Sequence, residues 1–339
     1  MKYGILNFST ETTVEDEIIG GESIQCFKCK SEDDLPDSIS RLEACMVWHE
    51  LQVTKTTIDR LKNCKVIVCV GVGFNNVDTK YAGSAGIPVV NIPDYGTNDV
   101  ADHTFALLLS LCRKITTYNS KLKENPALNW DVSLGGVIHR LTNAKLGIAG
   151  LGRIGTAVAG RAKAFGMDVS FYDPYIPDGY DKSLNIKRFS DLKSMFAVSD
   201  YICIHTPLTD ETYHMIGAEV LESAKTGITL INTARGAIVD LDAVYNSLKS
   251  GKLGTFASDV MEIEPPENAN PLIRAFSKGE PWLDGRMILT PHSAFYAVES
   301  RHEMREKAAR QMWNAVNGIP LRNCVNKEYL ITSGGVIHG

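Results

Sequence analysis

The most informative part of the sequence is "KLGIAGLGRIGTAVAGRAKAFGMDVSFYDPY", residues 145–175. A short apolar run leads into Gly150, Gly152 and Gly155, a helix-like segment follows, and a second apolar run ends at Asp173. In a strand–turn–helix unit the first glycine permits the tight turn and the second lets the backbone approach a pyrophosphate. The third lets the helix pack closely on the strand. The stretch therefore predicts a doubly wound, dinucleotide-binding domain.

The same stretch also indicates which dinucleotide binds. The amides of Arg153 and Ile154 open the helix, where the partial positive charge of a helix N-terminus favours phosphate. Asp173 lies 18 residues after Gly155. Its carboxylate can accept hydrogen bonds from the ribose hydroxyls of NAD, and it would repel the additional phosphate of NADP. We therefore predict NAD as the cofactor, with binding residues Gly150, Gly152, Arg153, Ile154, Gly155 and Asp173.

Strand-like and helix-like segments alternate along nearly all of the chain, which is typical of a parallel α/β sheet. At 339 residues the chain has the length of about two domains of roughly 150 residues each. We expect two doubly wound domains joined by one long helix over "NDVADHTFALLLSLCRKITTYNSKLKE", which begins at Asn98. The chain ends in another helical pattern, "VESRHEMREKAARQMWNAVNG", and periodicity alone does not assign that helix to either domain.

Composition excludes several classes of function. The net charge is −5, and no basic run is interleaved with aromatic residues, so we expect no direct nucleic-acid binding. No apolar window approaches a membrane span, and the N-terminal apolar run is too short for a signal peptide. We therefore expect no membrane association and a cytoplasmic protein, or a nuclear one if the source is eukaryotic. Cys26 and Cys29 form a lone CxxC, so we predict reduced structural thiols and no metal site.

Three charged or titratable residues follow strand-like segments in the second half of the chain. Arg235 follows "GITLINTA", Glu264 ends "TFASDVMEIE", and His292 follows "MILTP". Ligands of open α/β sheets bind beyond the carboxyl ends of the strands, so three strand ends can bring these groups to one crevice. Taken singly, each residue is as readily a surface or loop residue. Only their joint placement after a dinucleotide fold favours a functional interpretation.

Together the three residues suit hydride chemistry on a 2-oxo acid. The planar fork of Arg235 can bind both oxygens of a carboxylate. His292 can give a proton to the carbonyl oxygen and take it back in the reverse direction. A glutamate beside the imidazole, Glu264, would fix the ring tautomer and favour the protonated form. We therefore predict Arg235, Glu264 and His292 as the catalytic residues.

With these residues in place, the chain resembles the D-isomer-specific 2-hydroxyacid dehydrogenases. The likeness covers nearly the whole chain, through the motifs "GVGFNNVD" (71–78), "NIPDYGTNDVADHT" (91–104), "GLGRIG" (150–155), "HTPLTDETYHMIG" (205–217), "NTARGAIVD" (232–240), "ASDVMEIEPP" (257–266) and "ILTPHSAFY" (288–296). Within the family it looks closest to the C-terminal-binding protein branch, whose eukaryotic members are NAD(H)-sensing corepressors. That closer likeness lies in "RAKAFGMDVSFYDPY", "MREKAAR" and "IPLRNCVNKEYL".

The resemblance implies a Rossmann NAD-binding domain, residues 99–301, inserted into a flavodoxin-like substrate domain, residues 1–98 plus 302–339. It implies NAD(H)-dependent interconversion of a 2-oxo acid and a D-2-hydroxy acid, with Arg235 anchoring the substrate carboxylate and His292 and Glu264 as the acid–base pair. It also implies a homodimer formed through the NAD-binding domain. The alternative function is an NAD(H)-sensing, corepressor-like dimeric binding protein with weak dehydrogenase activity.

The resemblance also implies roles for individual positions. Those near the substrate are His49, Val72, Gly73 and Phe295, and those near the cofactor are Thr206, Pro207, Thr212, Thr233, Ala234 and Asp259. For His49 a buried structural histidine is the alternative interpretation. Two positions depart from the family. Cys69 stands where many members carry an arginine suited to phosphorylated acids, and Phe295 stands where the corepressor branch has tryptophan. Both departures indicate a different ligand preference, and Cys69 disfavours 3-phosphoglycerate.

Overall fold

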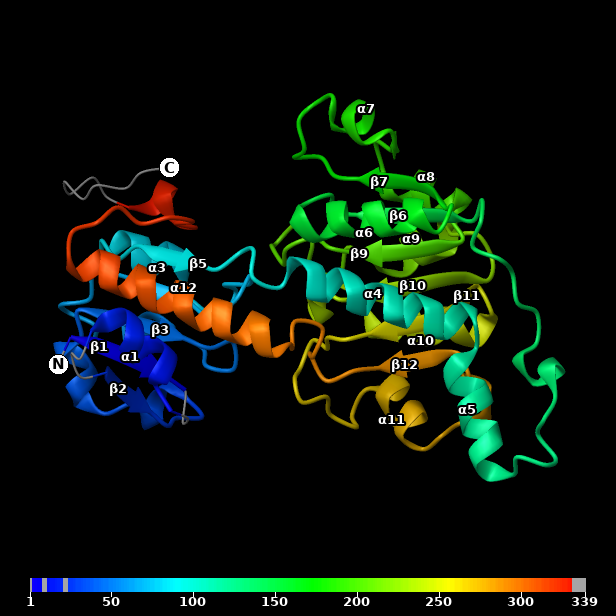
Figure 1. Ribbon diagram of the computed structural model, residues 1–339, viewed down its shortest axis with the longest axis horizontal. Coiled ribbons are helices and arrows are strands. Elements are labelled where there is room, and N and C mark those ends of the chain that lie inside the picture. The colour runs from blue at the N-terminus through cyan, green and yellow to red at the C-terminus, as the bar shows by residue number, and fades with distance from the viewer. Residues whose placement is uncertain (1, 8–10, 21–23, 331–339) are drawn as a thin grey trace. The chain divides into compact units, whose positions relative to one another are not determined.

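The computed structural model describes residues 2–7, 11–20 and 24–330, which form two compact units (Figure 1). Unit 1 combines Met1–Gly96 with Tyr296–Gly339, and unit 2 is Thr97–Phe295. The sequence-based boundaries at 98 and 301 lie close to these. Residues 331–339, which were assigned to the substrate domain, lie outside the described residues. In the part of the chain that is described, no helix is both long and apolar enough to cross a membrane.

Unit 1 contains a parallel sheet in the order β2-β1-β3-β4-β5. Its strands are β1 (Tyr3–Leu6), β2 (Ile24–Phe27), β3 (Ala44–Val47), β4 (Ile67–Cys69) and β5 (Val89–Asn91). Its helices are α1 (Thr13–Ile19), α2 (Lys55–Ile58), α3 (Thr79–Ser84), α12 (Val298–Val316) and the short 3₁₀ turns Glu32–Asp34, Asp37–Arg41 and Lys327–Tyr329. The strand order 2-1-3-4-5 is that of flavodoxin-like folds, which confirms the predicted fold class.

The last long helix of the chain belongs to unit 1. Helix α12 packs against α1, β3 and β4 (Figure 1). Arg305 of α12 binds the buried Glu15 of α1 through both carboxylate oxygens, at 2.7 Å from Nε and 2.5 Å from Nη2. This two-pronged geometry offsets the free energy that burial of the Glu15 charge would otherwise cost. Both ends of the chain therefore build one unit.

Unit 2 contains a parallel sheet in the order β12-β11-β10-β9-β6-β7-β8. Its strands are β6 (Lys145–Ala149), β7 (Asp168–Tyr172), β8 (Lys187–Arg188), β9 (Tyr201–Ile204), β10 (Ile228–Asn232), β11 (Leu253–Ser258) and β12 (Met287–Leu289). Counted from β6, the order is 3-2-1-4-5-6-7, the Rossmann order with one added strand. The direction of strand addition changes between β6 and β9, and this switch point is where such folds bind ligands.

Helices cover both faces of the unit 2 sheet. They are α4 (Thr97–Cys112), α5 (Ile115–Glu124), α6 (Arg153–Ala164), α7 (Tyr180–Leu184), α8 (Leu192–Val198), α9 (Ala218–Ser223), α10 (Leu241–Ser250), α11 (Pro271–Ser277) and the 3₁₀ turns Val132–Gly135, Gly236–Ile238 and Pro281–Leu283. Alternate strand residues face opposite layers: Leu230 and Phe256 join one core, and Ile231 and Ala257 join the other. Strands that are buried on both faces have continuous apolar runs in their sequences.

The predicted single long helix after residue 98 is wrong. The chain forms α4 and α5, separated at Lys114, which has a left-handed φ of 57°. The Lys114 ammonium donates a hydrogen bond to the Gly285 carbonyl at 3.1 Å, and this contact holds the break. Helix α4 also packs against α6 and against β10, β11 and β12. It is therefore a layer of unit 2 and not a connection between domains.

Candidate active site

The three predicted catalytic residues follow three neighbouring strands of unit 2. Strands β10, β11 and β12 pair in parallel, so that their carboxyl ends lie at one edge of the sheet. Arg235 follows the end of β10, Glu264 follows β11, and His292 follows β12. The sheet register therefore brings the segments that carry these three residues, which lie far apart in the sequence, to one edge of the sheet.

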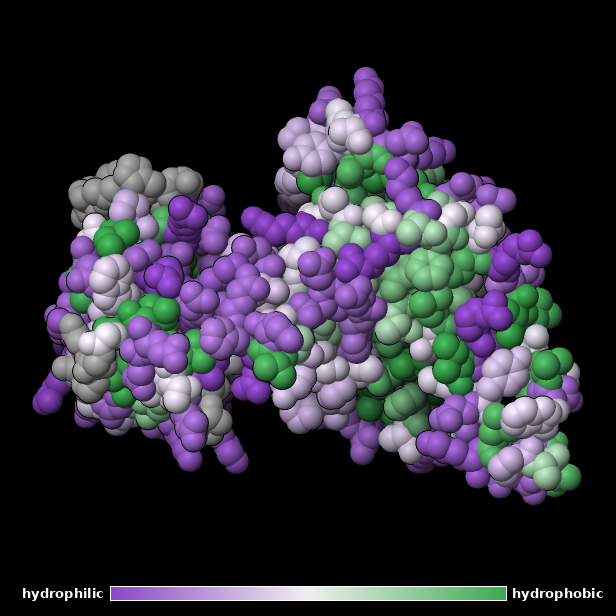
Figure 2. Space-filling view, in the orientation of Figure 1, coloured by the Kyte–Doolittle hydropathy of each residue, from purple (hydrophilic) through white to green (hydrophobic). Residues whose placement is uncertain are grey.

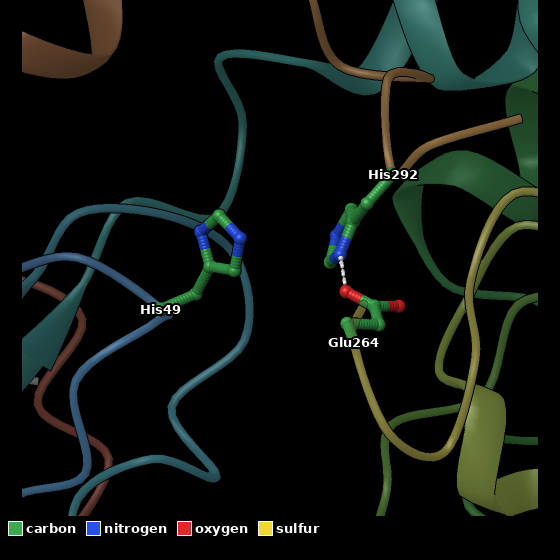
Figure 3. A group of neighbouring side chains, drawn as sticks. All are labelled: His49, Glu264 and His292. Carbon is green, nitrogen blue, oxygen red and sulfur yellow. Dashed lines mark hydrogen bonds and ion pairs between the residues drawn. The ribbon is translucent and has the colours of Figure 1, made fainter. Parts of the chain in front are cut away.

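His292 and Glu264 form a direct pair. The Nδ1 atom of His292 lies 2.7 Å from Oε2 of Glu264 (Figure 3). The other glutamate oxygen, Oε1, accepts a hydrogen bond from the Met261 amide at 2.8 Å, which fixes the carboxylate. The side chains are 21% and 30% exposed, so the pair is reachable by a small molecule yet partly shielded from water. A carboxylate on Nδ1 sets the tautomer and directs proton exchange to Nε2.

The turn that carries His292 is held by Asp259. This aspartate is 1% exposed, and its backbone carbonyl accepts from the His292 amide at 2.7 Å. Its carboxylate accepts from the Thr290 hydroxyl at 2.5 Å and from the Ser293 and Ala294 amides at 2.9 and 2.8 Å. His292 has φ of 50°, a conformation that a non-glycine residue adopts only where its surroundings fix it. The place of Asp259 near the cofactor stays a prediction.

His103 belongs to the same network, and sequence reasoning gave it no role. Its Nε2 lies 3.0 Å from the Thr290 hydroxyl and 3.6 Å from the Asp259 carboxylate. The only sequence signal was its place inside the motif "NIPDYGTNDVADHT". A partner 187 residues away could not be identified from spacing, because the contact depends on how α4 packs over the sheet.

Arg235 is half-buried, so the interpretation of a simple solvent-facing arginine does not hold. Its backbone carbonyl accepts from the Asn232 amide group at 2.9 Å, and its Nη1 donates to the Ala234 carbonyl at 2.7 Å. The next residue must be glycine, because a Cβ on Gly236 would lie 1.9 Å from the backbone carbon of Met261. The tight contact sets the segment that bears Arg235 against the segment that leads to Glu264.

The remaining predicted substrate residues fall in two places. Phe295 lies edge-on to the His292 ring in unit 2, with centroids 6.1 Å apart and planes at 85°. In unit 1, His49 follows β3, and Val72 and Gly73 follow the adjacent β4. The His49 side chain is 38% exposed, so the alternative of a buried structural histidine is wrong. Val72 is fixed through its carbonyl, which accepts from Asn91 at 2.6 Å.

The three glycines of the nucleotide motif have the geometry expected of them. Gly150 has φ of 92°, in the left-handed region that favours glycine. A Cβ on Gly155 would lie 2.1 Å from the Gly150 carbonyl oxygen, whereas a Cβ on Gly152 would meet nothing within 4 Å. The first and third glycines therefore serve the turn and the packing of α6. The second leaves open space at the N-terminus of α6, which Arg153 and Ile154 begin.

Asp173 directly follows β7 and is held in place by the backbone. Its two carboxylate oxygens accept from the amides of Leu151 and Tyr175, each at 2.9 Å. A carboxylate has about four acceptor positions, so both oxygens can still accept from ribose hydroxyls. The predicted cofactor residues of the glycine motif and Asp173 therefore lie at the carboxyl ends of β6 and β7.

Buried polar atoms lie at the switch point next to Gly150. A Cβ on Gly150 would lie 2.8 Å from the backbone of His205 and of Thr206, which follow β9. Among the described residues, the Thr206 hydroxyl and both ring nitrogens of His205 are buried without a hydrogen-bond partner. Burial lowers the pKa of His205 to about 3, so this ring is neutral. A bound ligand can supply such partners, and the site therefore fits a dinucleotide.

Four other predicted cofactor residues, Pro207, Thr212, Thr233 and Ala234, have contacts within the protein. Thr212 donates to the Pro207 carbonyl at 2.6 Å and accepts from the Thr209 amide at 2.8 Å, which folds the loop after β9. Thr233 is buried, with its hydroxyl 2.9 Å from that of Thr104 on α4. Ala234 is held through its amide, which donates to Asn232 at 3.0 Å. Their contacts with a cofactor stay predictions.

Comparison with known proteins places this site among relatives. The sequence model of the D-isomer specific 2-hydroxyacid dehydrogenase NAD binding domain matches residues 105–294. The D-3-phosphoglycerate dehydrogenases of Archaeoglobus fulgidus and Methanocaldococcus jannaschii are each 36% identical, over 297 and 296 residues, or 87% of this chain. The chain spans about half the length of these two relatives, 54% in each case.

Solved structures agree with the fold over nearly the full chain. The D-lactate dehydrogenase of Aquifex aeolicus, in complex with NAD and lactic acid, is 28% identical with a TM-score of 0.81 and covers 97% of both chains. The D-lactate dehydrogenase of Escherichia coli is 25% identical with a TM-score of 0.75, over 96% of this chain and 100% of that one. A glyoxylate reductase of Paecilomyes thermophila is also 25% identical, with a TM-score of 0.82 over 96% and 99%.

Proposed function

The chain belongs to the D-isomer-specific 2-hydroxyacid dehydrogenase family, and on that premise we propose that it interconverts a 2-oxo acid and a D-2-hydroxy acid with NAD(H). The observation that carries the proposal is the 2.7 Å bond between His292 Nδ1 and Glu264 Oε2. This pair lies at the edge of the sheet that also presents Arg235. A protein that only bound a dinucleotide would have no need for an oriented acid–base pair.

Each of the three residues has a defined task in this reaction. Arg235 binds the substrate carboxylate through its planar fork and polarises the neighbouring carbonyl. His292 holds a proton at Nε2 and gives it to the carbonyl oxygen, while Glu264 stabilises the imidazolium and keeps the ring oriented. NADH, when bound at the glycine motif, supplies the hydride. In the oxidation direction His292 takes the hydroxyl proton back.

We further propose that the preferred acid is unphosphorylated. Cys69 is 1% exposed at the end of β4, where the family pattern often has an arginine. Burial raises the pKa of its thiol to about 12, so it stays neutral and offers no positive charge to a phosphate group. The phosphoglycerate dehydrogenases are relatives in sequence, but a cation for a phosphate is lacking at this position.

The test is NADH oxidation, followed by absorbance, with pyruvate, glyoxylate, hydroxypyruvate and 3-phosphohydroxypyruvate. We expect turnover with at least one unphosphorylated acid at a higher kcat/KM than with the phosphorylated one. Arg235→Lys keeps the charge but loses the fork, so KM for the acid should rise roughly tenfold or more. Arg274→Lys, at an exposed position on α11, is the matched control. Tight NADH binding without turnover of any acid would contradict the proposal.

We propose a homodimer formed through unit 2, supported by an exposed apolar segment after α5. Leu128, Trp130, Val132 and Val137 are 79–85% exposed. The segment is tied to α5, because the Tyr118 hydroxyl donates to the Val132 carbonyl at 2.7 Å. Figure 2 shows further apolar residues on the face of unit 2 that carries α4 and α5. An exposed apolar surface of this kind is typical of an interface.

Light scattering on the purified chain tests the dimer. We expect the mass of two chains, and a shift toward one chain in Trp130→Ser, because loss of a large aromatic anchor at an interface weakens association. Val198→Ser is the control, since Val198 is a partly exposed apolar residue on α8. A single-chain mass for the wild type would refute this assembly and would leave the proposed reaction unaffected.

A further inference from the structure

A second group of titratable side chains includes Glu262, two residues before Glu264, together with Tyr213 and His214. The Tyr213 hydroxyl donates to Oε1 of Glu262 at 2.9 Å, and Nε2 of His214 lies 3.1 Å from Oε2 of Glu262. The Tyr213 and His214 rings are stacked, with centroids 4.1 Å apart and an interplanar angle of 16°. We call Tyr213, His214 and Glu262 the Tyr–His–Glu cluster. None of its members has a role in the proposed reaction.

The cluster joins the loop after β9 to the segment that carries Glu264. Tyr213 and His214 end the loop of residues 205–214, whose first residues border Gly150 at the nucleotide site. Glu262 lies between Met261, whose amide binds Glu264, and Glu264 itself. Because both oxygens of the Glu262 carboxylate face donors on the loop, the position of residues 261–264 depends on where that loop lies.

The segment that carries Arg235 contacts both the loop after β9 and the segment that carries Glu262. The His214 amide donates to the Ala237 carbonyl at 2.8 Å, and the Ile216 amide donates to the Ile238 carbonyl at 3.0 Å. On its other side this segment contacts the backbone of Met261 and Glu262 through Gly236. His214 has φ of 48°, so this residue is fixed in an uncommon backbone conformation at the point where the three segments meet.

We propose that the Tyr–His–Glu cluster is a positioning device that couples cofactor binding at the loop after β9 to the placement of the Glu264 carboxylate. Its members are positioning residues, because they act through Glu264 and Arg235 and do not touch the reacting atoms. The inference rests on the proposed function. An error of about 1 Å in the placement of a catalytic group can lower the rate a hundredfold, so the structure that sets Glu264 has kinetic consequences.

Hydrogen–deuterium exchange tests the coupling without any turnover. In the wild type, NADH should slow amide exchange in residues 205–216 and also in residues 259–264. In Glu262→Ala we expect NADH to protect residues 205–216 as in the wild type. The protection of residues 259–264 should weaken at least about threefold. Glu219→Ala is the matched control, because Glu219 is an exposed carboxylate of unit 2 bound to Lys193 at 2.7 Å. Equal protection of residues 259–264 in Glu262→Ala and wild type would overturn the inference.

Kinetics provide the second readout. Glu262→Ala should lower kcat roughly tenfold while the Kd for NADH stays within about twofold. Tyr213→Phe removes only one hydroxyl at an exposed position, should fold normally, and should give a smaller loss that is not additive with Glu262→Ala. An unchanged kcat in Glu262→Ala would also overturn the inference. If the wild type turns over no acid but shows the exchange pattern, the proposed reaction fails and the coupling stands.

Discussion

Two histidine–glutamate pairs lie in unit 2, and they are built from the same parts in different ways. His292 and His214 both have left-handed backbone conformations, with φ of 50° and 48°. Their partners, Glu264 and Glu262, are two residues apart on one segment. Glu264 pairs with Nδ1 of His292 at 2.7 Å, whereas Glu262 pairs with Nε2 of His214 at 3.1 Å and also accepts from Tyr213.

The ring nitrogen to which the carboxylate is hydrogen-bonded determines the chemistry that each pair can perform. A glutamate on Nδ1 leaves the distal nitrogen, Nε2, as the atom that exchanges a proton with a substrate, which is the arrangement of His292. A glutamate on Nε2 ties the distal nitrogen of His214 into the protein. Residue type and pairing therefore do not identify an acid–base catalyst by themselves. The orientation of the ring makes that distinction.

The largest expected effect separates the two histidines. His292→Asn should lower kcat by about 10³-fold, within the usual range for loss of a general acid–base group. His214→Asn should lower it only about tenfold, because a positioning contact is lost. Asparagine tolerates left-handed φ, so both substitutions leave the backbone conformation accessible. Single-turnover oxidation of NADH, with NADH affinity measured in parallel, makes the comparison. Equal losses in the two variants would remove the distinction.

A smaller effect is expected from the glutamates. Glu264→Gln retains an acceptor for Nδ1 but no negative charge to stabilise the imidazolium, so kcat should fall about 10–100-fold. Glu262→Gln can still accept from one of its two donors, and its loss should be smaller. NADH affinity should be similar in both variants. Initial rates at saturating NADH check this order, and a greater loss in Glu262→Gln would reverse the roles assigned to the two pairs.

The fold could be predicted because its signals are local. Glycine spacing at residues 150–155 and fully buried strands such as Ile228–Asn232 are legible in the sequence. The break between α4 and α5 at Lys114 could not be predicted, because the left-handed conformation of Lys114 depends on a contact with Gly285, 171 residues away. The C-terminal-binding protein branch stays a prediction, since it rests on sequence stretches alone.

The candidate site could be predicted only in part, for a related reason. Arg235, Glu264 and His292 each follow a strand closely, so strand-end reasoning finds them. The residues that hold them in place, such as His103 and Glu262, have partners fixed by the packing of α4 and by the path of the loop after β9. The spacing of residues within a sequence motif cannot reveal partners that lie far away in the chain.

A third histidine, His205, differs from both, because its two ring nitrogens are buried and neither is hydrogen-bonded by a described residue. Burial depresses the pKa of His205 to about 3, below the unfolded value of about 6.5. The unfolded chain therefore binds more protons between these values, and stability that is present above pH 6.5 is lost as the pH falls. At pH 5.5 this one group should lower the free energy of unfolding by about 1–2 kcal/mol.

Replacing His205 should make the protein less sensitive to acid. His205→Leu has a similar volume and no titratable nitrogen, so the melting temperature should fall less between pH 7.5 and 5.5 than in the wild type. His302→Leu, on an exposed face of α12, should retain the wild-type dependence. Calorimetry of the cofactor-free protein measures both. If the melting temperature of His205→Leu fell as much as that of the wild type between pH 7.5 and 5.5, His205 would not be a neutral, desolvated ring. The contrast with the two glutamate-paired histidines would then fail.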